Sequence, residues 1–401
     1  MRITTNMMYD RSVSSLMNTT ERLSKASEQL DTGDRFTTAG EDPTAMAQKL
    51  NLTSEIARYK QYSSNGTSLK NSLTLEETTL DSLYTAMNSA YSKVQQSING
   101  TNDATDLATL ATELEELQKQ MVDLMNTKDA SGQYLFSGNQ TQTQPFVLDG
   151  SGKYQYAGDA GQRSVQVSPT VKIAANDSGL ALFQSVATQR TATAGSTDIK
   201  VSISSQGQFD SFYSGNYDPA NAANNVFTVT TIAGTPDQYE IRDASSNVLQ
   251  TGNYTQGEDI TFNGLALNLN VAAGGSADFS LDAPSNDNIL NSLSDMITAL
   301  KDPAVSTDQL KALAASTQSH LSNAQESVNT TLGRVGGRLN TLDSVLASNE
   351  TLASLSKTTK ADVSEIDLVE AATNVTKESN ALSMAQQAYS MISKTTLFDY
   401  I

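Results

Sequence analysis

Apolar residues recur every seven residues near both ends of this chain, and in alternating steps of three and four further inward, and this repeat constrains the fold more than any other feature. Such spacing aligns one narrow apolar stripe along a helix and is typical of coiled-coil-like packing. The N-terminal stripe comprises Val13, Leu16, Leu23 and Leu30. The C-terminal stripe comprises Leu368, Val375, Leu382, Tyr389 and Ile392. Each end therefore predicts a long amphipathic helix, and the first runs from about Thr5 to a stop at Gly33.

The same stepping predicts further helices inward from both ends. They cover residues 41–60, 69–98, 107–124, 286–301 and about 307–355. Asp42 is a favourable N-cap for the first of these, and Pro43 suits its first helical position. Asp302-Pro303 stops the short helix in the second half, because proline cannot continue a helix.

The period changes in the middle of the chain, where short β-type runs are separated by glycine and proline. Residues from about 132 to 175 predict a small hairpin-rich insert. Residues 183–284 predict a separate all-β domain with seven runs: 199–203, 226–232, 238–242, 248–250, 260–262, 265–271 and 278–281. Asn263-Gly264 between two of these runs is a typical hairpin turn.

These elements predict an α+β fold, with a long coiled-coil-like helical rod made from both chain ends, a small β-hairpin region and an inserted all-β outer domain. The expected division is into a terminal helical domain (1–40 and 360–401), a helical rod domain (41–182 and 285–359) and the outer domain (183–284). The order of elements is nearly palindromic, so the two ends must come together.

Composition excludes much chemistry. The 401 residues include no Cys, no Trp and one His, His320, so thiol catalysis, disulfides and multi-histidine metal sites are ruled out. The net charge of −18 disfavours nucleic-acid binding. The sequence contains no run of 18 apolar residues, so no membrane helix is predicted, and no apolar segment near the N-terminus resembles a signal peptide. We therefore expect no cofactor, no metal, no small-molecule substrate and no enzymatic activity.

The remaining candidates for chemistry have simpler structural interpretations. His320 lies beside a stripe position on a predicted helix, with no nucleophile set near it in sequence. The glycines at 333, 336 and 337 lack the context of a phosphate loop and favour close helix approach or a local bend. The carboxylate pairs Glu76/Glu77 and Glu115/Glu116 are expected on solvated helix faces.

Two terminal helices with narrow stripes leave much apolar surface uncovered, and a lone two-helix hairpin is marginal in water. Both stripes could be core positions of one globular domain. The alternative is packing between molecules, with the predicted assembly interface at Ile3, Val13, Leu16, Leu23, Leu30, Leu368, Val375, Leu382, Tyr389 and Ile392.

Several motifs together resemble the bacterial flagellin superfamily. The resemblance rests on Met1–Thr5, Leu30–Arg35 with Glu41-Asp42-Pro43, Leu332–Leu339, Ser364–Ala372, Gln386–Tyr389 and Leu397–Tyr400. The segment Ala130–Gly138 with Thr141 and Pro145-Phe146 is similar to the hook–filament junction branch, the hook-associated protein 3 family, rather than to filament flagellin. One departure is Asp31, where the family more often has Ser.

The resemblance implies a structural protein that is secreted unfolded through the flagellar type III apparatus and located in the bacterial flagellum, at the hook–filament junction. It implies partners of the same kind, a hook-side junction protein and flagellin, and an export chaperone bound near the C-terminal helix. It also implies terminal helices that fold on assembly and line an inner tube. A filament flagellin, an exported adhesin-like surface protein and an exported enzyme carried by the β domain are the alternatives.

Overall fold

The computed structural model describes residues 5–394 and confirms the predicted α+β class. The chain forms two compact units. The first contains the residues up to Lys70, Val165–Ile173 and the residues from Leu339 onward. The second contains Asn71–Ser164 and Ala174–Arg338. The long helices α2 (Pro43–Ser97) and α6 (Thr307–Ser364) each contribute residues to both units.

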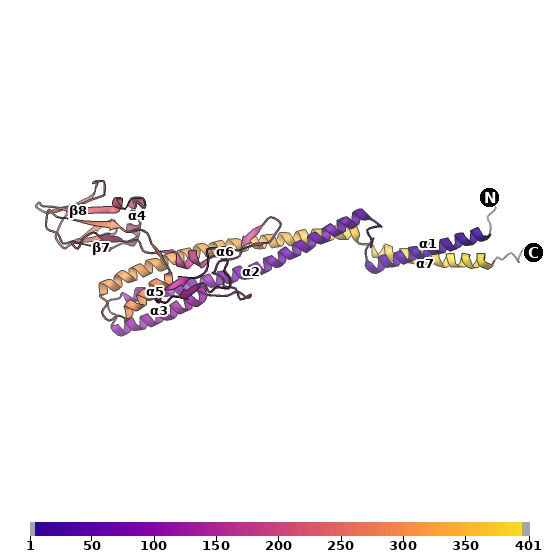
Figure 1. Cartoon of the computed structure of the whole chain (residues 1–401), viewed down its shortest axis with the longest axis horizontal. Coiled ribbons are helices and arrows are strands. Elements are labelled where there is room, and N and C mark those ends of the chain that lie inside the picture. Colours follow the sequence, from indigo (N-terminus) through magenta and orange to yellow (C-terminus); the bar gives the residue numbers. More distant parts are fainter. Residues whose placement is uncertain (1–4, 395–401) are drawn as a thin grey trace, which may run out of the picture. The chain divides into compact units, whose positions relative to one another are not determined.

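The first unit brings the two ends of the chain together. Helices α1 (Thr5–Thr32) and α7 (Leu368–Lys394) lie side by side and antiparallel, so that the start of α1 lies beside the end of α7 (Figure 1). Gly33, with φ of 70°, follows α1, and its N–H donates to the Gln29 carbonyl at 3.0 Å. This left-handed glycine confirms the predicted stop. Asp367 caps α7, because its carboxylate accepts the N–H of Val369 at 2.8 Å.

Helix α2 begins as predicted, since the Asp42 carboxylate accepts the N–H of Ala45 at 2.9 Å. It then continues without a break to Ser97, whereas the sequence pattern predicted separate helices at 41–60 and 69–98.

In the first unit α2 packs against α6, and residues 165–173 form most of a hairpin of β3 (Ser164–Gln166) and β4 (Lys172–Ala174). Asn349 of α6 holds this hairpin by donating to the Val167 carbonyl at 2.7 Å.

Close helix approach occurs at Gly66 rather than at the glycines of α6. A Cβ added to Gly66 would lie 2.6 Å from Cδ2 of Leu346, so this side chain would have to shift for a larger residue to fit where α2 meets α6. A Cβ added to Gly333 or Gly336 would meet no described atom within 4 Å. The predicted close approach within the chain at these α6 positions is therefore wrong, and no packing in the described chain requires them.

We therefore expect Gly333→Ala to raise the free energy of unfolding by about 0.5–1 kcal/mol, because alanine loses less backbone entropy in a helix interior. Urea denaturation followed by circular dichroism measures this change. Gly66→Ala is the matched control and should destabilise the protein, because the neighbouring Leu346 must move. A Gly333→Ala variant that is less stable than the parent would contradict the assignment of open space there.

The second unit contains a helical bundle of α2 from Asn71, α3 (Ala104–Met125), α5 (Ile289–Lys301) and α6 up to Arg338. Asp103 caps α3 in a reciprocal capping box with Asp106. The apolar stripes meet in its core, which includes Leu73, Leu80, Leu83, Met87, Leu114, Met121, Leu293, Met296, Leu321 and Val328. The predicted end of α5 before Asp302-Pro303 is confirmed.

The predicted hairpin-rich insert is present, and part of it packs on this bundle. Strands β1 (Phe146–Leu148) and β2 (Tyr154–Tyr156) form an antiparallel pair, and a π-helix covers Leu180–Gln184. Phe183 packs edge-on against Phe136 and Phe146, with ring centroids 5.5 and 5.8 Å apart. These three buried rings give the insert its own small core.

The β region forms two antiparallel sheets. The larger has the order β10 (Val248–Asn253), β9 (Gln238–Arg242), β8 (Val226–Ile232), β13 (Ser276–Leu281) and β6 (Ala192–Ala194). The smaller has the order β11 (Asp259–Phe262), β12 (Leu265–Leu269) and β7 (Ile199–Ile203). Asn263 and Gly264 both have positive φ and join β11 to β12 as predicted. Strands β7, β8 and β9 have the predicted bounds.

The β region also contains a helix that the sequence pattern did not predict, α4 (Gln206–Asn216). Its sequence contains two glycines and two serines among eleven residues and has little helix propensity. Phe209 and Tyr213, four residues apart, are nonetheless buried on one face of α4 in the core between the sheets. Burial of these rings therefore stabilises the helix. Among residues 5–394, no helix is both long and apolar enough to cross a bilayer.

Candidate assembly interface

The terminal helix pair brings together most of the predicted interface residues. An inner stripe packs α1 against α7, and eight of the ten residues lie on it half-buried: Val13, Leu16, Leu23, Leu30, Val375, Leu382, Tyr389 and Ile392. Leu368, at the start of α7, is 60% exposed instead. Ile3 lies outside the described residues. The stripes thus serve first to join the two ends of the same chain.

Polar contacts flank the inner stripe and set the register of the two helices. The hydroxyls of Tyr9 and Tyr389 are 2.7 Å apart, and their rings are in tilted contact. Arg22 donates from Nε to the Glu378 carboxylate at 3.0 Å. Both contacts lie in exposed surroundings, so each contributes little stability by itself. The two contacts instead fix the register. Moving forward along α1 from Tyr9 to Arg22 corresponds to moving backward along α7 from Tyr389 to Glu378, as an antiparallel pair requires.

A second set of large apolar side chains on the same pair stays exposed in the described part of the chain. We call it the outer surface, and it comprises Met7, Met8, Tyr9, Met17, Leu368, Val369, Met384 and Met391. On α7, Met384 and Met391 are seven residues apart and therefore share a face. Met384 borders a shallow groove with Thr373, Thr376 and Asn380. Apart from Leu368, the sequence pattern did not reveal these side chains, because methionine and valine between polar residues do not form a regular stripe.

A buried charged network lies in the second unit. Arg338 of α6 donates from both terminal nitrogens to the carboxylate of Asp177, at 2.8 and 3.0 Å. Glu76 of α2 accepts the backbone N–H of Asp177 at 3.0 Å and is 1% exposed. The expectation of a solvated Glu76 is therefore wrong. Glu76 occupies a stripe position between Leu73 and Leu80, and this position is the signal that could have revealed its burial.

Burial raises the pKa of Glu76 to about 8, with a further contribution from the Asp177 carboxylate. The charged groups that face it are Asp177, Arg338 and Arg334. Because the folded protein holds this proton more tightly than the unfolded chain, stability should fall as the pH rises from about 4.5 to about 8. The contribution of Glu76 to this slope is about 1.4 kcal/mol per pH unit.

Glu76→Gln should remove that contribution, because glutamine keeps the hydrogen-bond acceptor but cannot ionise. Urea unfolding between pH 5 and 8 measures the slope. Glu77→Gln, one residue further along α2, is the control and should leave the slope unchanged. Equal slopes in the parent and the Glu76→Gln variant would contradict a protonated Glu76 at neutral pH.

His320 is a buried structural contact. It is 1% exposed, and its Nε2 donates to the Val186 carbonyl at 3.2 Å. A carbonyl can only accept, so Nδ1 of the neutral ring accepts from the hydroxyl of Ser292. Burial lowers the pKa of His320, which favours this neutral form. Both ring nitrogens are therefore occupied, and the side chain ties α5 and α6 to strand β5 (Val186–Ala187).

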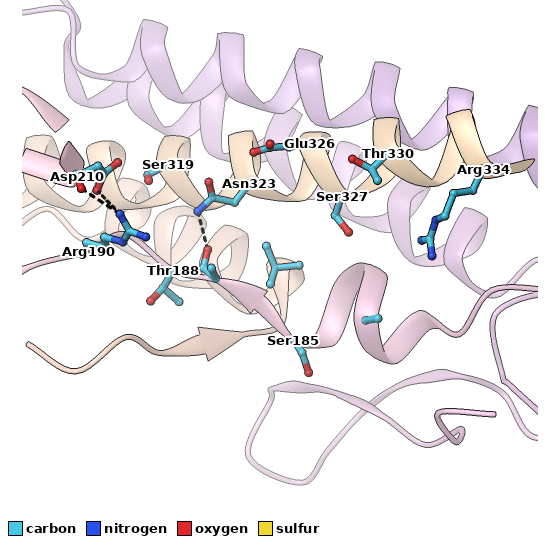
Figure 2. Close-up of a pocket in the computed structure, with 13 residues that line it drawn as sticks. Ser185, Thr188, Arg190, Asp210, Ser319, Asn323, Glu326, Ser327, Thr330 and Arg334 are labelled. Carbon is cyan, nitrogen blue, oxygen red and sulfur yellow. Dashed lines mark hydrogen bonds and ion pairs between the residues drawn. The ribbon is translucent and has the colours of Figure 1, made fainter. Parts of the chain in front are cut away.

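A polar cleft of about 470 Å³ lies between α6 and the segment that enters the β region (Figure 2). Asn323 of α6 donates to the Ala187 carbonyl at 2.8 Å, and Arg190 donates to the Asp210 carbonyl at 3.2 Å. Arg334, at the other end of the cleft, donates to the Thr331 hydroxyl at 2.6 Å. The first two contacts connect neighbouring segments, the third lies within α6, and we assign the cleft no reaction.

Metal chemistry finds no support in the described chain. Nowhere between residues 5 and 394 do three His, Asp or Glu side chains gather closely enough to hold a metal ion. The terminal helix pair offers its inner stripe and outer surface instead. The geometry thus favours a packing function.

Comparison with known proteins agrees with this geometry. Residues 3–141 match the model of the bacterial flagellin N-terminal helical region. A 186-residue alignment is 33% identical to flagellar hook-associated protein 3 of Escherichia coli and covers 46% of this chain and 58% of that protein. In sequence and in fold, this chain resembles flagellar hook-associated protein 3. The resemblance inferred from the sequence motifs is thus confirmed.

Two solved structures have a fold similar to that of this chain. The crystal structure of flagellar hook-associated protein 3 from Legionella pneumophila has a TM-score of 0.60 and 23% identity, over 78% of this chain and 98% of that chain. The flagellar junction protein FlgL from Legionella pneumophila has a TM-score of 0.58 and 24% identity, over 79% and 100%. These likenesses show a shared fold. The sequence alignment spans little more than half of the Escherichia coli relative.

Proposed function

We propose that this chain is a structural subunit of the bacterial flagellum that joins the hook to the filament. The observation that carries the proposal is the terminal helix pair, which covers one apolar stripe and leaves eight large apolar side chains exposed. Exposed large apolar side chains in this number favour association, since packing against further helices would remove them from water. The likeness to hook-associated proteins supports this role over other assemblies.

In this proposal the terminal segments 1–40 and 360–401 line an inner tube. Residues 41–182 and 285–359 form the surrounding rod layer, and 183–284 point outward. The predicted interface residues on the inner stripe keep part of their surface exposed in the monomer, so neighbouring subunits would cover the remainder. Contacts that repeat around a tube are heterologous, which is the interface type that closes into rings or extends into helices.

The proposed route to this place is secretion in an unfolded state through the flagellar type III apparatus, with a chaperone bound near the C-terminal helix until export. The proposed partners are further copies of this chain, a hook-side junction protein and flagellin. No catalytic activity, cofactor, nucleic acid or membrane partner belongs to the proposal. The absence of cysteine suits such a route, because no thiol can cross-link the unfolded chain.

Complementation tests the proposal. The full chain, expressed in a strain that lacks its own hook–filament junction protein, should restore filaments on hooks, whereas a form without residues 1–40 and 360–401 should not. Purified protein should add to hook ends without forming long filaments by itself. Spontaneous growth of long filaments would instead identify a filament flagellin. Activity that survives loss of both terminal segments would place the function in the β region.

A further inference from the structure

Nine of the eleven methionines of this chain fall into two groups that differ in solvent exposure. Four of the eleven are fully buried in the helical bundle of the second unit: Met87, Met121, Met125 and Met296. Five are exposed, by 46 to 72%, and all five lie on the terminal helix pair: Met7, Met8, Met17, Met384 and Met391. Met46 is half-buried, and Met1 lies outside the described residues. Solvent access to thioether side chains is thus concentrated on the outer surface.

These thioethers are the softest groups that the chain offers to an oxidant. The sequence contains neither cysteine nor tryptophan, so no thiol or indole competes for a two-electron oxidant. Oxidation follows access, and the four buried methionines are shielded by the close-packed bundle. An oxidant that reaches the folded monomer therefore meets the outer surface first.

We propose that the terminal helix pair is a reversible methionine-oxidation site that controls whether the subunit can assemble. This inference rests on the proposed function, because it requires the outer surface to be buried between subunits. The relevant oxidants are peroxides and hypohalous acids. Oxidation before assembly blocks packing, whereas packing shields the same side chains from later oxidation.

The chemical step is an oxygen transfer. A lone pair of the methionine sulfur attacks one oxygen of hydrogen peroxide, an S–O bond forms and the O–O bond breaks. The proton on the transferred oxygen passes to the departing hydroxide, which leaves as water. The sulfur loses two electrons and becomes a sulfoxide, while the peroxide is reduced. The flexible apolar side chain becomes polar, and burying its new oxygen without a hydrogen bond opposes packing. Each sulfoxide at a buried contact should weaken association by about tenfold or more.

Peptide mass spectrometry of the peroxide-treated full chain tests where oxidation occurs. Sulfoxide should form at the five exposed methionines, while the four bundle methionines stay reduced until urea unfolds the protein. The treated protein should bind isolated hooks at least about tenfold more weakly than untreated protein. Reduction by methionine sulfoxide reductases of both stereospecificities should restore binding. Oxidation spread evenly over all methionines would overturn the proposal.

Variants separate methionine oxidation from general damage. Replacing all five exposed methionines with leucine keeps apolar volume and should make hook binding resistant to peroxide. The matched control Met121→Leu with Met296→Leu retains the exposed five and should stay sensitive. The smaller variant Met17→Leu with Met384→Leu should retain more binding than the parent at the same dose. Equal loss in parent and leucine variants would overturn the proposal.

The untreated parent distinguishes this inference from the function on which it rests. If untreated protein does not bind hooks at all, the proposed junction role is wrong. If untreated protein binds and fully oxidised protein binds equally well, the junction role stands and the oxidation control is wrong. Oxidation of hook-bound protein supplies the last readout, since the five sites should then be protected at least about tenfold relative to the free monomer.

Discussion

Replacing Arg338 with methionine is expected to destabilise the second unit by about 3–5 kcal/mol. The guanidinium makes both of its hydrogen bonds with Asp177, whose side chain is only 7% exposed. Methionine fills similar volume but leaves the Asp177 carboxylate buried without a cation and close to Glu76. Urea denaturation at constant pH, followed by circular dichroism, measures the loss.

Two further variants test the cause of this loss. Adding Asp177→Asn to Arg338→Met should recover part of the stability, because no unpaired charge then remains. Lys70→Met is the matched control, since Lys70 pairs with Asp343 at 2.7 Å on an exposed surface. That change should cost no more than about 1 kcal/mol. An Arg338→Met variant as stable as the Lys70→Met variant would contradict a buried, stabilising pair.

Leu382→Asp is expected to abolish assembly while the β region stays folded. Leu382 lies half-buried on the inner stripe of α7, where it packs against α1. A carboxylate at this position must be buried without a partner or must force the two helices apart, and either outcome removes the paired surface that assembly requires. Filament formation on hooks in the complemented strain measures assembly.

Ser383→Asp is the matched control for this prediction, because Ser383 is exposed on the same helix and the change adds the same charge. That variant should still form filaments. The β-sheet contribution to the far-UV circular dichroism spectrum should be the same for both variants and the parent, since the β core shares no residue with α7. Normal filament formation by the Leu382→Asp variant would show that the inner stripe is not needed for assembly.

Local features of the sequence predicted element bounds well. Gly33 ends α1 because glycine reaches positive φ without strain, and Asp302-Pro303 ends α5 because proline cannot continue a helix. Short β-type runs bounded by turn residues predicted strands β7, β8 and β9 to the residue. In each case the cause acts within a few residues, so it is visible without knowledge of the fold.

The failures share a different cause. Helix α4 has weak local propensity and exists because Phe209 and Tyr213 pack into a core built from distant strands. Gly66 lies between the two helices predicted at 41–60 and 69–98, and its contact with Leu346 of α6 is not visible in the local sequence. Glu76 resembles a solvated carboxylate until Asp177 and Arg338 enclose it. Partners far away in the sequence decide each of these environments.

The stripes near both ends, read from the sequence alone, determined that the two termini form helices and that these helices pair. The tertiary structure decided which apolar residues this pairing uses and which it leaves exposed. A stripe indicates that a helix has an apolar face but does not identify the surface that covers this face. Only the packed pair separates Leu382, half-buried against α1, from Met384, exposed on the outer surface two residues later.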